Sequence, residues 1–200
     1  MALEPIGVLD LSLVTGLLVN LIDDYWNTAP LWTTLAPGSK FTPTVSGLTP
    51  DEVRILRFLA VAGAQPAIDV RTKTLFQIGS ERIAGGINMI AEMAGCRWPG
   101  SDQEYLANLY RLGLVRFSAE PVDDYRRYAL IEVQPRATEA VAKAKATLSI
   151  YRSIYLSPFG RQFCKVCIDV TGYDAGGWGT DERGDKIIGR GPPDPAARKH

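Results

Sequence analysis

The sequence is poor in histidine, cysteine and net charge, and each shortage excludes a class of function. The only histidine is the terminal His200, so a positioned imidazole base is not expected and the chain is predicted not to be an enzyme. Three cysteines are too few for a disulfide framework, which favours a reducing, cytoplasmic location. The 22 basic residues balance 22 acidic ones, so the chain lacks the positive excess that binds nucleic acid regardless of sequence.

Long hydrophobic runs are also missing. The mostly apolar stretch from Ile6 to Ile22 contains Asp10, and no basic residue precedes Lys40. It therefore has neither the length of a membrane span nor the basic flank of a signal peptide or lipid-bound helix, and we expect no membrane association. The spacing predicts an amphipathic helix instead. Its apolar side carries the residues that we expect to mediate self-association: Val14, Leu17, Leu18 and Leu21.

What is present is the composition of a globular protein, with 46% hydrophobic and 22% charged residues in 200. Pro, Gly, Ser and Thr are frequent before and after the central part of the chain. We therefore predict an N-terminal helix and linker over residues 1–47, a main domain over 48–169 and a flexible Gly/Pro-rich tail over 170–200.

Three helix starts carry local signals. Thr49-Pro50-Asp51-Glu52 has the pattern of a capping box and predicts a helix to Ala62. Ser101-Asp102-Gln103-Glu104 has the same pattern, and its helix is expected to end at Gly113. Ser157-Pro158 predicts a third start. The residues expected to face the core from the first of these helices are Val53, Leu56, Leu59 and Ala60.

The remaining segments are assigned from periodicity. Pro66 to Val70 is expected to be a strand, and Ser80 to Ala94 a helix because apolar residues recur every three or four positions. Leu114–Phe117 and Tyr125–Val133 are expected to pair as a hairpin. A helix over Arg136–Leu148 and a short extended piece over Ser153–Leu156 are also predicted.

This order of elements predicts a mostly helical α+β domain of the winged helix-turn-helix type, with the helix before Gly113 presented outward and the hairpin as the wing. The surfaces of this domain are not strongly basic. Residues 51–169 contain 16 basic and 13 acidic residues. Protein recognition is therefore favoured over duplex DNA, which stays the alternative partner. The residues expected to contact either partner are Gln103, Asn108, Arg111, Arg126 and Arg127.

No pattern indicates a cofactor, a metal site or a small-molecule substrate. Cys164-Lys165-Val166-Cys167 lies too far inside its helix for a reactive thiol pair, and a zinc site would require a second pair of ligands. Two buried, inert thiols are the preferred interpretation.

Three segments of the sequence resemble the signature segments of the bacterial Abi-alpha family, namely Leu48–Leu56, Tyr105–Leu114 and Leu156–Ile168. In that family the last segment typically carries one cysteine, to which Cys167 corresponds, while Cys164 is an addition. The resemblance implies a role in bacterial defence against phage and brings no established catalytic residue. We therefore expect a non-enzymatic phage-defence protein that acts by protein–protein recognition. A DNA-binding transcriptional regulator is the alternative.

Overall fold

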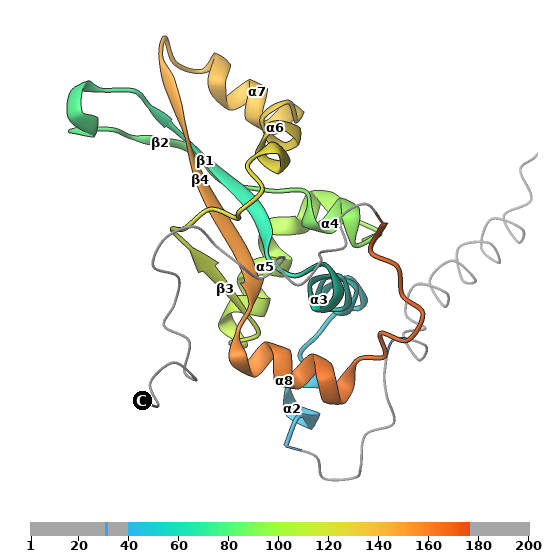
Figure 1. Cartoon of the computed structure of the whole chain (residues 1–200). Helices are drawn as coiled ribbons and strands as arrows, with labels where there is room; N and C mark the ends of the chain where they lie inside the picture. Colours follow the sequence, from blue (N-terminus) through green and yellow to red (C-terminus); the bar gives the residue numbers. More distant parts are fainter. Residues whose placement is uncertain (1–30, 32–39, 177–200) are drawn as a thin grey trace, which may run out of the picture.

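The computed structural model describes Leu31 and residues 40–176, and these form an α+β fold around a curled antiparallel half-barrel sheet (Figure 1). The four strands are β1 (Gln65–Thr72), β2 (Arg82–Ile87), β3 (Val115–Ser118) and β4 (Thr147–Leu156), in the order β2-β1-β4-β3. The two long strands are central. Ala67 lies opposite Arg152 across them, and Phe117 lies opposite Ile154 at the β3 edge.

Seven α-helices in the described part of the chain cover the two faces of this sheet. They are α2 (Thr42–Val45), α3 (Pro50–Ala62), α4 (Ile90–Met93), α5 (Asp102–Arg111), α6 (Arg126–Glu132), α7 (Pro135–Ala142) and α8 (Pro158–Cys167), with short 3-10 turns η2 (Leu75–Gln77) and η3 (Pro99–Ser101). Because side chains alternate along a strand, the two central strands β1 and β4 contribute residues to two hydrophobic cores, one on each face of the sheet. Ile68 and Val70 pack against α6 and α7, whereas Ala67 and Ile154 pack with α3 and α8.

The helices with local start signals are confirmed, with one exception in their capping. Thr49 and Glu52 form a complete capping box at α3, and Ser157 accepts a hydrogen bond from the Gly160 amide at the start of α8. Helix α5 also forms and ends before Gly113, which has a φ of 73°. Ser101, however, makes no side-chain cap there, so the predicted second capping box is wrong. Of the residues expected to face the core from α3, only Ala60 is exposed.

Two assignments from periodicity are wrong. Residues 80–94 form strand β2 and then the short helix α4 rather than one helix. Ile83 and Ile87 are four residues apart, an even spacing that places them on one face of a strand as readily as on one side of a helix. Residues 126–132 form helix α6 rather than a strand, because Tyr128 and Ile131 are buried together at helical spacing.

The predicted wing is therefore wrong as well. Strand β3 pairs with β4, which follows only after α6 and α7, instead of pairing with the segment Tyr125–Val133. Strand β4 is also longer than the predicted piece and begins at Thr147, which shortens the preceding helix to Pro135–Ala142. The described residues thus do not show a winged helix-turn-helix topology, although the α+β class is confirmed.

The predicted N-terminal helix lies outside the described residues, and so do its self-association residues Val14, Leu17, Leu18 and Leu21. The tail beyond residue 176 lies outside them too. Within residues 40–176, no helix has the length and apolar character needed to cross a membrane.

Candidate functional site

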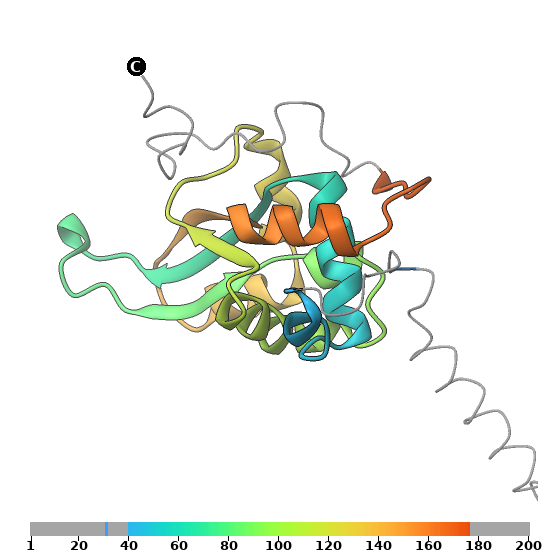
Figure 2. The ribbon, with the colours of Figure 1, turned by 90° about the horizontal axis from the view of Figure 1, so that it is seen from below.

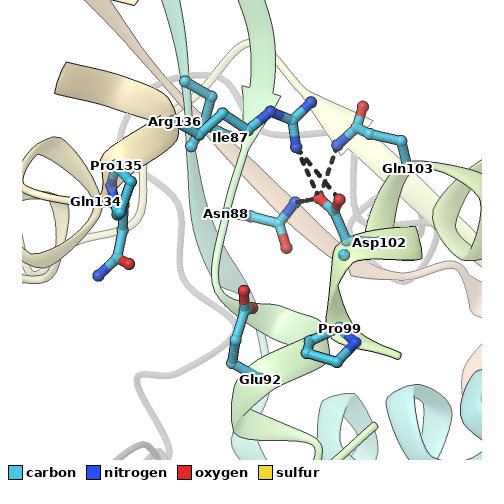
Figure 3. Close-up of a pocket in the computed structure, with 10 residues that line it drawn as sticks. Ile87, Asn88, Glu92, Pro99, Asp102, Gln103, Gln134, Pro135 and Arg136 are labelled. Carbon is cyan, nitrogen blue, oxygen red and sulfur yellow. Dashed lines mark hydrogen bonds and ion pairs between the residues drawn. The ribbon is translucent and has the colours of Figure 1, made fainter. Parts of the chain in front are cut away.

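Two adjoining pockets open along strand β2, and Gln103 at the start of α5 lines both. The first, of about 320 Å³, lies between β2, α4, α5 and the start of α7 (Figure 3). The second, of about 440 Å³, lies on the face of the sheet that carries Ala67 and Ile154, beside Asp69, Arg152 and Phe117. We call the two together the polar groove.

A buried carboxylate organises the first pocket. Asp102 accepts hydrogen bonds from Asn88 Nδ2 at 3.0 Å and from Gln103 Nε2 at 2.8 Å. Arg136 Nη1 lies 3.2 Å from Asp102 Oδ1 and 3.3 Å from Oδ2. Figure 3 shows these three side chains converging on the carboxylate from the connection after β2, from α5 and from α7. Asp102 therefore ties the start of α5 to two other elements instead of capping its own helix.

Gly86 joins the two pockets through its backbone. Its amide donates to Asp69 Oδ1 at 2.9 Å, and its carbonyl accepts from Asn88 Nδ2 at 2.8 Å and from Gln103 Nε2 at 3.0 Å. The residue has a φ of 63° and lies where the β1–β2 register shifts, as in a β-bulge. Glycine suits this position because residues that carry a side chain rarely adopt a positive φ.

The second pocket is organised by an ion pair across the two central strands. Arg152 Nε lies 3.2 Å from Asp69 Oδ2. Tyr128 fixes the same stretch of β4 from the opposite face, because its hydroxyl donates to the Arg152 carbonyl at 2.7 Å and accepts from the Val122 amide at 2.8 Å. Burial raises the pKa of Tyr128 to about 12, so this hydroxyl stays protonated and can donate.

Glu92 lines the first pocket, and its pKa is raised from the ordinary value. Burial raises its pKa and the negative charge of Asp102 raises it further, while a backbone hydrogen bond and the charge of Arg136 act in the opposite direction. Asp69 and Asp102 each have a guanidinium partner. The residues that line the polar groove include no histidine or cysteine. This arrangement offers fixed hydrogen-bond donors and acceptors and is suited to binding.

Three of the residues predicted for partner contact lie on α5, and their side chains form hydrogen bonds with other residues of the protein. Gln103 faces the polar groove as described above. Asn108 Nδ2 donates to Glu52 Oε1 at 2.6 Å and to the Gly47 carbonyl at 3.1 Å, so it connects α5 to the start of α3. Arg111 donates to Asn108 Oδ1 at 2.6 Å. The structure thus brings Asn108 and Arg111 together, whereas Gln103 lies at the other end of the helix.

The other two predicted residues lie on α6. Arg126 forms an exposed ion pair with Asp124 at 2.8 Å, which raises the pKa of Arg126 and lowers that of Asp124. Arg127 is partly buried and donates to the Ala64 carbonyl at 3.3 Å and to the Gln65 side chain. Burial lowers the pKa of Arg127. These arginines belong to a different element from Gln103, Asn108 and Arg111, and the partner-contact role of all five stays a prediction.

The three cysteines are free thiols of low reactivity. Burial raises the pKa of Cys96 and of Cys164 to about 12 and also raises that of Cys167. A thiol that stays protonated is a poor nucleophile and a poor metal ligand. Among residues 40–176, no group of three or more histidine, cysteine or acidic side chains is arranged to hold a metal ion.

Sequence reasoning missed most of the polar groove. Asp69, Asn88, Arg136 and Arg152 were not singled out, and Asp102 was named as part of the predicted capping box, although its side chain is buried in the pocket. The one local signal was the Gly85-Gly86 pair, which fits the β-bulge better than a helix.

The three segments that carry the family resemblance contact one another at the base of the sheet. Asn108 of the second segment bonds Glu52 of the first. Ser157 of the third donates through its amide to the Leu114 carbonyl of the second at 2.9 Å. A Cβ atom at Gly160 would lie 1.9 Å from that same carbonyl oxygen, so α8 approaches the start of β3 too closely for any side chain there. The three segments thus form a structural junction, and the residues that line the polar groove lie between them in the sequence.

A comparison with models of known protein families agrees with this resemblance. The family model described as abortive infection alpha matches residues 39–167 of the chain. Among solved structures, the chain is similar to an uncharacterized protein from the hydrocarbon-degrading marine bacterium Alcanivorax borkumensis SK2. The identity is 23% and the TM-score 0.44, over 62% of this chain and 88% of that one. The comparison with curated proteins finds no match.

Proposed function

Because the chain belongs to the abortive infection alpha family, we propose that it is a cytoplasmic phage-defence protein that acts by recognising another protein rather than by catalysis. The observation that carries the proposal is an aromatic pair at the rim of the polar groove. Tyr110 of α5 and Phe117 of β3 lie with their ring centroids 5.4 Å apart, and both are about half exposed. We call this pair the aromatic rim.

The position of the aromatic rim favours a protein partner. Phe117 lines the groove and belongs to β3, an edge strand of the described sheet. An edge strand offers backbone groups to an extended segment of a partner, and aromatic side chains are enriched at protein interfaces. The charges of Asp69 and Asp102 are already neutralised within the groove, so a partner does not need to supply counter-charges.

Site-specific crosslinking tests this proposal directly. A photoreactive phenylalanine analogue is placed at Phe117 in the full chain, and at Val133 as a control, which is 68% exposed at the end of α6 and does not line the groove. In phage-infected cells we expect a discrete protein adduct from position 117 and none from position 133. Equal adducts from both positions, or none from either, would contradict the proposal.

Phage protection provides the functional readout. Phe117→Asp is expected to abolish any protection that the wild-type chain gives in a plaque assay, while Val133→Asp keeps it, because only Phe117 borders the groove. Protection that survives Phe117→Asp at equal protein levels would exclude the aromatic rim as the recognition surface.

Self-association through the predicted N-terminal helix is the second part of the proposal. Leu17→Asp with Leu21→Asp in the full chain would place two charges on the predicted apolar side. We expect these substitutions to convert an oligomer into a monomer in sedimentation velocity. A wild-type chain that is already monomeric would refute this part and leave the aromatic rim untouched.

A further inference from the structure

The loop between β1 and β2 carries an exposed apolar cluster that the proposed function does not use. Leu75, Phe76 and Ile78 are 82%, 87% and 78% exposed. Figures 1 and 2 both show this hairpin projecting beyond the rest of the described fold. We call the three residues the hairpin tip. Scattered single apolar residues are ordinary on protein surfaces, but three within four positions at the apex of a projection indicate a docking element.

Hydrogen bonds join the two sides of the hairpin at the base of the tip. At its base the Thr72 amide donates to the Glu81 carbonyl at 2.9 Å, and Arg71 Nη2 donates to the Ser80 carbonyl at 2.6 Å. Phe76 has a φ of 55° and is the one non-glycine residue between 40 and 176 with a positive φ. Such strain outside glycine often accompanies a functional constraint.

Basic residues are frequent in the two segments that meet at the base of the tip. The Lys73 amide donates to the Ala146 carbonyl at 2.9 Å, which brings the turn between α7 and β4 beside the hairpin. The two segments 71–82 and 139–147 contain two acidic residues, Glu81 and Glu139. They contain five basic residues, which we call the basic collar: Arg71, Lys73, Arg82, Lys143 and Lys145.

We propose that the hairpin tip inserts into the surface of an anionic lipid bilayer while the basic collar contacts the headgroup phosphates. Apolar side chains that penetrate the headgroup boundary, together with nearby lysines and arginines, are the combination that gives peripheral membrane binding. The tip is a projection rather than a groove, and a bilayer accepts such a projection without a preformed cavity. The N-terminal segment, from which the sequence predicts no membrane association, plays no part in this contact.

Vesicle co-sedimentation of the full chain tests the proposal. We expect binding to vesicles made of equal parts phosphatidylcholine and phosphatidylglycerol, and little binding to phosphatidylcholine alone. The triple variant Leu75→Ser, Phe76→Asn, Ile78→Ser should bind at least about tenfold more weakly, since the apolar insertion is lost. Asparagine is chosen at position 76 because it tolerates a positive φ. Val133→Ser, which removes an exposed apolar side chain elsewhere, is the matched control and should bind like the wild type.

The basic collar and the depth of insertion are tested separately. Lys143→Ala and Lys145→Ala should each weaken binding roughly fivefold, and added salt should reduce the difference. Ile78→Trp should show fluorescence quenching by lipids brominated on their acyl chains. Circular dichroism shows whether each variant is folded. If the triple variant is unfolded, its three substitutions are tested one at a time.

Two results would overturn the proposal. The first is that the wild type binds equally well to the two vesicle types, or that it binds no more tightly than the triple variant. The other is a concentration-dependent dimer that disappears in the triple variant while vesicles remain unbound, which would assign the tip to a second copy of the chain. Both results leave the crosslinking test of the aromatic rim unaffected.

Discussion

Helices α3 and α5 begin with the same pattern of residue types, but the structure uses the two patterns differently. At α3, Thr49 and Glu52 cap the helix through reciprocal hydrogen bonds of 2.6 and 3.3 Å. At α5, Ser101 makes no side-chain cap, and the preceding 3-10 turn runs directly into the helix. The comparison shows that one local pattern can serve either helix capping or contacts between distant elements.

The acidic residues within the two patterns differ in the same way. Asp51 is fully buried and accepts from the Arg97 and Trp98 amides, the Tyr105 hydroxyl and the Arg54 guanidinium. Asp102 is bound as completely, but it lines a pocket and its partner Arg136 is 46% exposed. Asp51 therefore stabilises the interior of the fold, whereas Asp102 stabilises the wall of a pocket that is open to a partner.

Asp51→Ala is expected to have the largest effect. It removes the side-chain acceptor of two part-buried backbone amides and of a buried tyrosine hydroxyl, and it removes the carboxylate that pairs with Arg54. We expect the free energy of unfolding to fall by about 3–5 kcal/mol. Urea denaturation followed by circular dichroism measures this loss. A loss no larger than that of Asp102→Ala would show that the two carboxylates are equivalent.

Asp102→Ala is expected to cost less, about 1–3 kcal/mol, because Arg136 and Gln103 can turn toward water when their acceptor is removed. The same substitution should disturb the polar groove. Crosslinking from position 117 is therefore expected to weaken in this variant, whereas a variant of Asp124 on the exposed surface should leave it unchanged. Undiminished crosslinking would mean that Asp102 stabilises the fold without shaping the groove.

Thr49 and Ser101, at the starts of α3 and α5, test the same comparison with a smaller expected change in stability. Thr49→Ala removes the acceptor of the Glu52 amide and should lower stability by about 1 kcal/mol. Ser101→Ala removes a hydroxyl that caps nothing, and its unfolding midpoint should match that of the wild type. The two variants are measured side by side in urea. A similar loss in both would indicate that Ser101 caps α5 in solution.

The contrast also explains what the sequence could predict. The starts of α3 and α8 and the end of α5 at Gly113 follow from residues close in the chain, so they were predictable. The pairing of β3 with β4 was not, because two helices separate the strands and no local signal marks the partner. The groove was missed for the same reason, since Asp69 meets Arg152 only through the pairing of β1 with β4.

The smallest expected effect concerns the pKa of Glu92, which is raised by burial first and then by the charge of Asp102. Because the folded protein holds the Glu92 proton more tightly than the unfolded chain, this group costs stability as the pH rises from about 4.5 through its folded pKa. Asp102→Asn removes the second cause and should move the pKa of Glu92 down toward its ordinary value, an effect that carbon-detected NMR titration resolves. Asp124 is the internal control, since its lowered pKa depends on Arg126 and should not change. A Glu92 pKa that stays the same would mean that Asp102 has no electrostatic effect across the pocket, and its difference from Asp51 would then lie in exposure alone.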